Sequence, residues 1–125
     1  MITPIRLACV VSVCLAVASF AGGANAQDAK HGQQVFTACA ACHATDNTTR
    51  LGPGLQGIIG RRSGSMAGFR YSRAMKNANI TWDEKSLDAY INSPQVSVPG
   101  TTMPFSGLPN AGDRADLIAY LQTLK

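Results

Sequence analysis

The sequence predicts a small all-α domain that follows an N-terminal export signal. Three observations indicate this fold class. Near the C-terminus, over residues 111–124, the residues Leu117, Ile118, Leu121 and Leu124 recur at helical spacing and fall on one face. No segment alternates apolar and polar residues as a half-buried strand would. Two long stretches rich in glycine or proline lie between the helical segments, and they limit regular structure to a few short helices.

The first 26 residues have the layout of a cleaved secretory signal peptide. Arg6 precedes an apolar run from residue 7 to about residue 21, and small residues follow as far as Ala26. The run is about fifteen residues long, and a membrane-spanning helix needs roughly twenty, so cleavage is favoured over retention as an anchor. We therefore expect the mature domain to span residues 27–125 in the periplasm, without Cys9 and Cys14.

The predicted mature chain is short and mildly basic. Removal of 26 from 125 residues leaves 99, with ten Lys or Arg, seven Asp or Glu and a net charge of +3. Five of the ten cations lie in the basic segment 61–76, which either steers an acidic partner or keeps the protein in solution. Nucleic-acid binding is not expected, because no base-reading helix or ribbon accompanies the segment. A chain this short often needs a covalent or metal-held group to complete its core.

The first helix is predicted from residue 29 to residue 40, because Asp28 is a favourable N-cap. Glycine, proline and small polar residues dominate residues 45–70, which predicts a long irregular loop. A loop of this length in a compact domain is functional or wraps around something. A short helix at residues 72–77 is expected to follow this loop.

A longer helix is predicted over residues 82–92. Thr81 and Glu84 have the spacing of a capping box at its start, and Pro94 is expected to end it. The following stretch, residues 94–110, contains four prolines and is predicted to be irregular. It separates this helix from the amphipathic helix at the C-terminus.

Cys39, Cys42 and His43 form the motif C-x-x-C-H at the end of the first predicted helix. Thiol–disulfide exchange places C-x-x-C at the start of a helix, often beside a strand. Zinc needs three or four ligands, and the mature chain offers only these three residues and His31. Haem attachment uses all three residues, because the thiols reach the vinyl groups of one macrocycle while the histidine ligates the iron. The motif therefore favours one covalent haem c.

A second axial ligand is expected on the opposite face of the haem. The candidates are His31, Met66, Met75 and Met103. His31 has the character of a surface residue, and a methionine in a helix usually packs in the core. Met103 lies in a proline-restricted segment sixty residues after His43, which leaves enough chain to pass around the ring. We therefore predict that Met103 is the ligand.

At this point the sequence resembles class I cytochrome c, close to the mitochondrial protein and its short periplasmic bacterial relatives. The stretches that carry the resemblance are, in order, KHGQQVF, CAACH, LGPGLQGIIGRRSG, GFRYSRAMKN, ITWDEKSLDAYI, VPGTTMPFSGL and DRADLIAYLQTLK. The resemblance implies a small cytochrome c fold, in which packed N- and C-terminal helices, shorter helices and loops surround one covalent haem. It implies that Gly32 and Phe36 meet Leu117 and Tyr120, because a glycine lets two helices approach closely.

The family pattern also implies roles around the haem. Pro53 would accept a hydrogen bond from the ring N–H of His43. A buried propionate needs donors and positive charge, and the residues at the matching positions are Arg61, Tyr71 and Trp82. On the methionine side the matching residues are Tyr90 and Thr101, and Phe105 matches an aromatic residue that covers the haem edge.

The resemblance implies a soluble, monomeric one-electron carrier that is not an enzyme. Its expected partners are membrane or periplasmic redox proteins, such as a quinol-oxidising cytochrome complex, a terminal oxidase, a reaction centre or a dehydrogenase. Thr102 replaces the lysine of the mitochondrial form, which indicates a weaker positive ring around the haem edge. Two alternatives stay open: a dedicated partner of one dehydrogenase, and a haem peroxidase or gas-binding protein in which Met103 dissociates.

Overall fold

The computed structural model describes residues 26–125, and over this range the chain forms six helices and no strand. An isolated bridge pairs Arg62 with Thr81. The predicted all-α class is therefore confirmed. The predicted signal peptide, apart from Ala26, lies outside the described residues. Within residues 26–125, no helix has both the length and the apolar character needed to cross a membrane.

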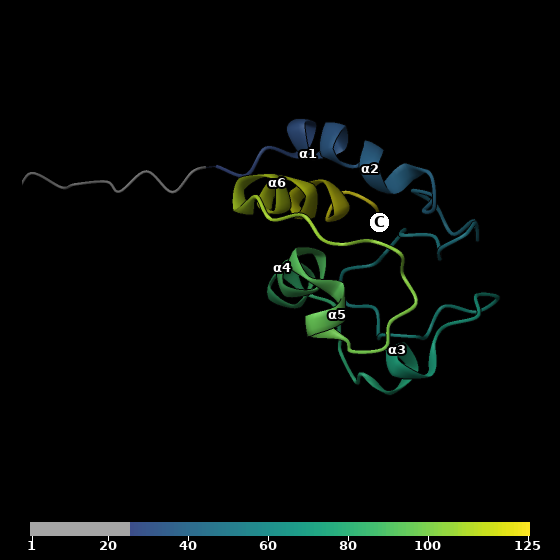
Figure 1. The fold of residues 1–125 in the computed structure, drawn as a ribbon. Coiled ribbons are helices and arrows are strands. Elements are labelled where there is room, and N and C mark those ends of the chain that lie inside the picture. Colours follow the sequence, from purple (N-terminus) through teal and green to yellow (C-terminus); the bar gives the residue numbers. More distant parts are fainter. Residues whose placement is uncertain (1–25) are drawn as a thin grey trace, which may run out of the picture.

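The N- and C-terminal helices pack against each other. Helix α1 spans Ala29–Val35, and α6 spans Ala111–Leu121. Figure 1 shows α1 and α2 lying along α6 on one side of the domain. Gly32 is buried on α1 against the backbone of α6. One turn later, the rings of Phe36 and Tyr120 lie 5.4 Å apart. The helix pairing implied by the family resemblance is therefore confirmed.

The first predicted helix is interrupted. It is divided into α1 and α2, which spans Thr37–Ala40. At the junction, the Thr37 hydroxyl donates a hydrogen bond of 2.7 Å to the carbonyl of Gln34. Such a side chain competes with the backbone for its hydrogen-bond partners and bends helices. The C-x-x-C-H motif nevertheless begins in the last turn of α2, as predicted. The backbone carbonyl of Phe36 accepts hydrogen bonds from the N–H groups of both Cys39 and Ala40.

Helix α4, Glu84–Asn92, begins with a different capping box from the one predicted. The Asp83 carboxylate accepts from the Ser86 backbone at 2.7 Å, and the Ser86 hydroxyl accepts from the Asp83 backbone at 2.9 Å. The predicted box at Thr81 and Glu84 is therefore wrong. Thr81 instead forms the bridge with Arg62, a partner distant in sequence, and lies outside the helix.

The remaining helices are short. Ser72 caps α3, Arg73–Asn77, and the final helix α6 ends at Leu121 rather than at residue 124. Part of the predicted irregular stretch forms α5, Pro94–Ser97. Proline favours the first position of a helix, where its fixed φ is suitable and its missing N–H has no partner to lose. Pro94 therefore ends one helix and begins the next.

The core lies between the α1–α6 pair and α4, and it continues along the loops. Its buried members are Phe36, Ile58, Met75, Trp82, Leu87, Tyr90, Val98, Leu117, Ile118 and Leu121. Several of these side chains face a central cavity instead of another helix. The short helices and long loops therefore form the walls of this cavity.

A histidine and an aspartate join the start of α1 to α6. His31 Nδ1 lies 2.8 Å from Asp116 Oδ2, and the backbone N–H of Asp28 donates to Asp116 Oδ1 at 2.7 Å. The hydrogen bond to Asp116 raises the pKa of His31 above its ordinary 6.5. The bonds from Asp28 and then His31 lower the pKa of Asp116 below 3.8. Both side chains are thus charged between pH 3.8 and pH 6.5.

We expect the α1–α6 pair to be most stable at mildly acidic pH. The contribution of His31 to the free energy of unfolding is complete below pH 6.5 and is lost as pH rises through its raised pKa. The contribution of Asp116 is lost as pH falls through its lowered pKa. The free energy of unfolding of His31→Gln, measured in urea, should therefore differ more from that of the parent protein at pH 5 than at pH 8.5. A difference of equal size at both pH values would contradict this assignment.

Candidate functional site

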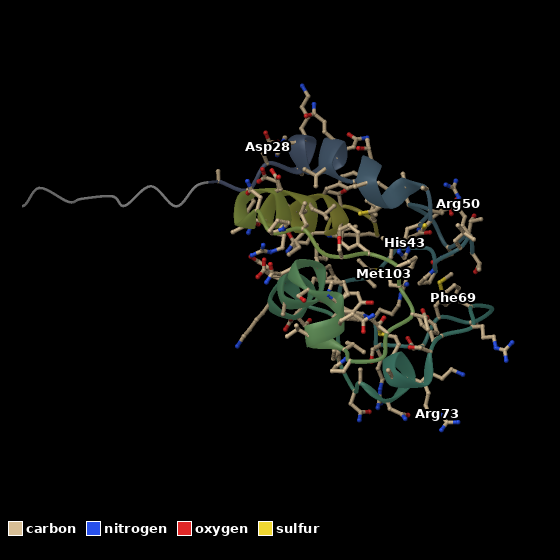
Figure 2. All side chains as sticks on the ribbon, viewed as in Figure 1. Asp28, His43, Arg50, Phe69, Arg73 and Met103 are labelled. Atoms are coloured by element: carbon tan, nitrogen blue, oxygen red, sulfur yellow. The ribbon has the colours of Figure 1, made fainter. Side chains whose placement is uncertain are left out.

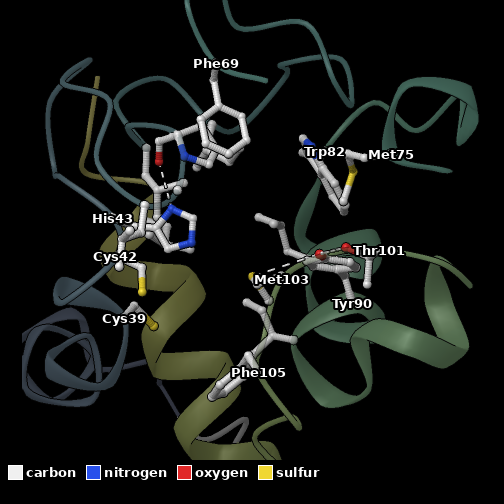
Figure 3. A pocket seen from close by; sticks show the side chains of 18 of the residues that line it. Cys39, Cys42, His43, Phe69, Met75, Trp82, Tyr90, Thr101, Met103 and Phe105 are labelled. Atoms are coloured by element: carbon white, nitrogen blue, oxygen red, sulfur yellow. Dashed lines mark hydrogen bonds between the residues drawn. The ribbon is translucent and has the colours of Figure 1, made fainter. Parts of the chain in front are cut away.

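All the site residues predicted from the sequence line one cavity of about 450 Å³. It lies between α2, α3, α4, α6 and the loops that follow His43 and precede α6. The predicted residues in its lining are Cys39, Cys42, His43, Pro53, Arg61, Tyr71, Trp82, Tyr90, Thr101, Met103 and Phe105. Figure 3 shows the cavity with the motif on one side and Met103 on the other.

The two thiols enter the cavity from the end of α2. Cys39 and Cys42 are both free and partly buried, and Figure 3 shows them on the same side of the cavity as His43. Burial, and secondarily the neighbouring Cys42, raises the pKa of the Cys39 thiol. Cysteines of thiol–disulfide exchange instead have a lowered pKa at a helix N-terminus. The site therefore favours covalent attachment of a group over redox exchange.

His43 is held in a defined orientation. Its Nδ1–H donates a hydrogen bond of 2.7 Å to the carbonyl of Pro53, as the family resemblance implied. This bond leaves Nε2 as the nitrogen with a free lone pair. Gly52 packs against the ring, and a Cβ at this position would lie 2.5 Å from His43 Cε1 and 2.8 Å from Nδ1. The missing side chain of Gly52 therefore makes the space that the imidazole occupies.

The thioether of Met103 lies across the cavity from the imidazole (Figure 3). The Tyr90 hydroxyl donates to Met103 Sδ at 3.9 Å and lies 2.8 Å from Thr101 Oγ1. Burial raises the pKa of Tyr90, so this hydroxyl keeps its proton at neutral pH. The sulfur is therefore held by a short polar chain that begins on α4.

Arg61, Trp82 and Tyr71 line another part of the cavity wall. The Arg61 guanidinium donates to the carbonyls of Gly54, at 2.7 Å, and Gln56. Trp82 is buried, and its ring centroid lies 5.2 Å from that of Tyr90. This wall therefore combines a fixed cation with aromatic groups.

Met75 and Phe69 also line the cavity. Met75 was weighed only as an axial ligand and set aside in favour of Met103, and Phe69 was not singled out from the sequence. Met75 is buried on α3, and Figure 3 shows it beside Trp82. The Phe69 ring packs edge-on against Tyr71, with centroids 4.8 Å apart. No local sequence signal identifies these contacts, because each depends on loops that meet only in the folded chain.

A zinc site finds no support in the described residues. Across residues 26–125, no group of three or more His, Cys, Asp or Glu side chains has a geometry that could hold a metal ion. His31, the fourth candidate zinc ligand, is paired with Asp116 and does not line the cavity.

The cavity fits a c-type haem. It brings together two thiols, an imidazole with a free Nε2 and a facing thioether, which are the attachment and axial groups of such a haem. Its walls are mostly apolar, and its volume of about 450 Å³ lies within the range of roughly 300–1,000 Å³ that is usual for cofactor sites. Fold and site together define a c-type haem protein.

The chain belongs to the cytochrome c family, whose model matches residues 29–125. It is 48% identical over 100 residues to cytochrome c2 of Rhodomicrobium vannielii, covering 78% of this chain and 80% of that one. It is 51% identical over 98 residues to the cytochrome c-type cyt cy of Rhodobacter capsulatus. That match covers 78% of this chain but spans only about half, 49%, of the relative.

A solved structure supports the same assignment. The fold is similar to that of cytochrome cH from Methylobacterium extorquens, with a TM-score of 0.74 and 37% identity over 77% of this chain and 98% of the other. The predicted small cytochrome c fold is therefore confirmed. As a member of this family, the protein is a c-type cytochrome electron carrier with one haem c, bound covalently through Cys39 and Cys42.

Proposed function

We propose that this protein is a one-electron carrier whose haem iron is ligated by His43 and Met103, and that it is not an enzyme. One observation supports this proposal most directly. The free Nε2 of His43 and the sulfur of Met103 face each other across an apolar cavity, and each side chain is held by a hydrogen bond. Ligation by both residues would leave the iron without an open position for oxygen or peroxide.

The haem supplies an iron that alternates between the ferrous and ferric states. His43 stays a neutral ligand, because its other nitrogen donates to the Pro53 carbonyl. Met103 contributes a neutral thioether, and the buried apolar walls disfavour extra charge. The chain therefore favours the less charged ferrous state and a high reduction potential. Because the side chains are already in place, little needs to move when an electron is transferred.

We assign the polar wall of the cavity to the haem propionates. Arg61 contributes a fixed positive charge, since two backbone carbonyls hold its guanidinium. Tyr71 and Trp82 line the same cavity and carry the hydroxyl and indole N–H donors that a buried carboxylate needs. Phe105 is assigned to cover the haem edge, because it borders the cavity close to Met103 in the chain.

We infer that the signal peptide, residues 1–26, is removed and that residues 27–125 act in the periplasm as a monomer. Docking to a membrane or periplasmic redox protein, whether a quinol-oxidising complex, an oxidase, a reaction centre or a dehydrogenase, needs only a brief contact. The basic segment 61–76 contains five Lys or Arg residues and no Asp or Glu. Figure 2 shows Arg73, which belongs to this segment, far from Asp28. We propose that this segment favours acidic partners.

The ligand assignment predicts different results for two methionines in the cavity. The purified holoprotein should show a c-type haem spectrum with a weak ferric band from sulfur ligation. Met103→Ala should abolish this band, because it removes the proposed ligand, while Met75→Ala should keep it and lose about 2 kcal/mol of stability from the cavity it creates. Absorption spectroscopy measures the band, and the opposite pattern would replace Met103 with Met75 as the ligand.

A haem peroxidase or gas-binding protein is the competing class. In that class Met103 would dissociate readily, and the native ferrous protein would bind carbon monoxide rapidly at neutral pH. The hydrogen bond from Tyr90 to Met103 supports the electron carrier instead. Genomic neighbourhood and pull-down against periplasmic and membrane oxidoreductases would separate a general shuttle from a dedicated partner of one dehydrogenase.

A further inference from the structure

We propose that Arg114 on α6 is a positioning residue for Met103. It would hold the C-terminal end of the ligand segment, residues 98–110, and so keep the thioether at the iron. The inference rests on the proposed ligation by Met103. Arg114 does not line the cavity and therefore acts only through the segment it binds.

The ligand segment has no helix or strand and depends on a few anchors. Its N-terminal end is anchored by Thr101. The backbone N–H of Thr101 donates to Val98 at 3.0 Å, its carbonyl accepts from the Gln95 side chain at 2.8 Å, and its hydroxyl meets Tyr90. These contacts hold the chain two residues before the sulfur.

The C-terminal end of the segment meets the last turn of α4. The Leu108 N–H donates to the Ile91 carbonyl at 2.9 Å. Gly107 has a φ of +117° and packs so closely on the Asn92 carbonyl that a Cβ would overlap it. Residues 90–92 of α4 therefore contact both ends of the ligand segment.

Arg114 completes this second anchor. Its Nη1 donates to the carbonyls of Leu108 at 2.9 Å and Pro109 at 2.8 Å, and to Asn92 Oδ1 at 3.2 Å. Its Nε donates to Asp88 Oδ1 at 2.7 Å. The whole residue is only 8% exposed. One buried cation therefore joins α6 and α4 to two consecutive carbonyls of the ligand segment.

The two sides of the guanidinium have separable tasks. The Nε bond to Asp88 joins helix to helix and does not involve the ligand segment. Two of the three Nη1 bonds end on the segment itself, at Leu108 and Pro109, and the third reaches Asn92 of α4. Removal of Arg114 would leave two carbonyls without their charged donor, and buried groups without partners favour conformations that reach water. A lysine would keep the charge, but its compact ammonium cannot reproduce the planar fork.

The experiment measures how readily an added ligand displaces the native one in the ferric holoprotein. Imidazole binds the iron only when the segment opens, so its apparent affinity rises with the open fraction. We expect Arg114→Met to raise the imidazole affinity about tenfold, equivalent to ~1.4 kcal/mol, and to weaken the ferric sulfur band. Arg114→Lys should give a smaller rise of about threefold, and it provides the test if Arg114→Met does not fold.

Asp88→Asn is the matched control. It removes the charge that faces Nε but leaves the Nη1 bonds to Leu108 and Pro109. It should lower the urea midpoint of unfolding while changing the imidazole affinity less than twofold. The inference is overturned if the Arg114 variants match Asp88→Asn in imidazole affinity, because Arg114 would then support only the helices. Met103→Ala tests the ligand assignment separately: if it keeps the sulfur band, the proposed ligation itself fails.

Discussion

Replacement of Gly32 by alanine should destabilise the protein by about 3 kcal/mol or more, at the upper end of overpacking effects. The added Cβ would overlap the backbone carbonyl of Asp116 and lie 3.0 Å from the backbone nitrogen of Leu117. Backbone atoms inside a helix cannot rotate away as a side chain can, so α1 must move away from α6. Since small domains are stable by only about 5–15 kcal/mol, urea unfolding should show a large fall in the midpoint.

Gly112→Ala provides the matched control, because Gly112 is also a helical glycine of the α1–α6 pair. A Cβ at this position would meet only the side-chain oxygen of Asn110, at 3.2 Å. Alanine is favoured over glycine in helices by about 1 kcal/mol, which offsets this mild crowding. We expect its unfolding midpoint to stay close to that of the parent protein. A similar loss in both variants would show that the close approach at Gly32 is not the cause.

Gly52→Ala should disturb the axial histidine while leaving the rest of the fold in place. The new Cβ would lie 2.5 Å from Cε1, 2.8 Å from Nδ1 and 3.0 Å from Nε2 of His43. The ring must therefore shift or rotate, and its hydrogen bond to Pro53 would weaken or break. We expect a fall of about 2–3 kcal/mol in the free energy of unfolding, a changed haem spectrum and a lower reduction potential, measured by spectroelectrochemical titration.

The control for this variant is Gly57→Ala, at an open position in the same loop. No atom lies within 4 Å of a Cβ at Gly57, although its φ of +67° strains any other residue. That strain costs roughly 1–2 kcal/mol. The unfolding midpoint should fall, but the spectrum and the reduction potential should not change. An altered potential in Gly57→Ala would attribute the effect to loop strain rather than to the imidazole.

The helices could be predicted wherever their signals are local. Asp28 and the apolar spacing of α6 correctly indicated the two terminal helices. The capping box was wrong because Thr81 has the right side chain but takes part in a bridge with Arg62 instead. A backbone bridge between distant residues leaves no mark in the nearby sequence. Helix α5 was missed for a related reason, since proline both ends and begins helices.

The residues of the candidate site could be predicted from the sequence, but the contacts that hold them in place could not. The C-x-x-C-H motif indicated the haem, and every site residue predicted from the motif, from the chain spacing or from the resemblance lines the cavity. Neither identified the packing of Gly52 on the His43 ring, nor the bonds of Arg114 to the ligand segment. These contacts join residues that are several to many positions apart, so spacing along the chain does not reveal them.

The amino-acid sequence was sufficient to identify the covalent chemistry and the helical class, because a haem motif and an amphipathic helix are local patterns. The placement of the thioether opposite the imidazole depends on the tertiary structure. Long loops have no regular hydrogen-bonding pattern of their own, so their course depends on distant anchors such as Tyr90, Gly52 and Arg114. Those anchors meet their partners only in the folded chain, which forms a cavity with the imidazole and the thioether on opposite sides.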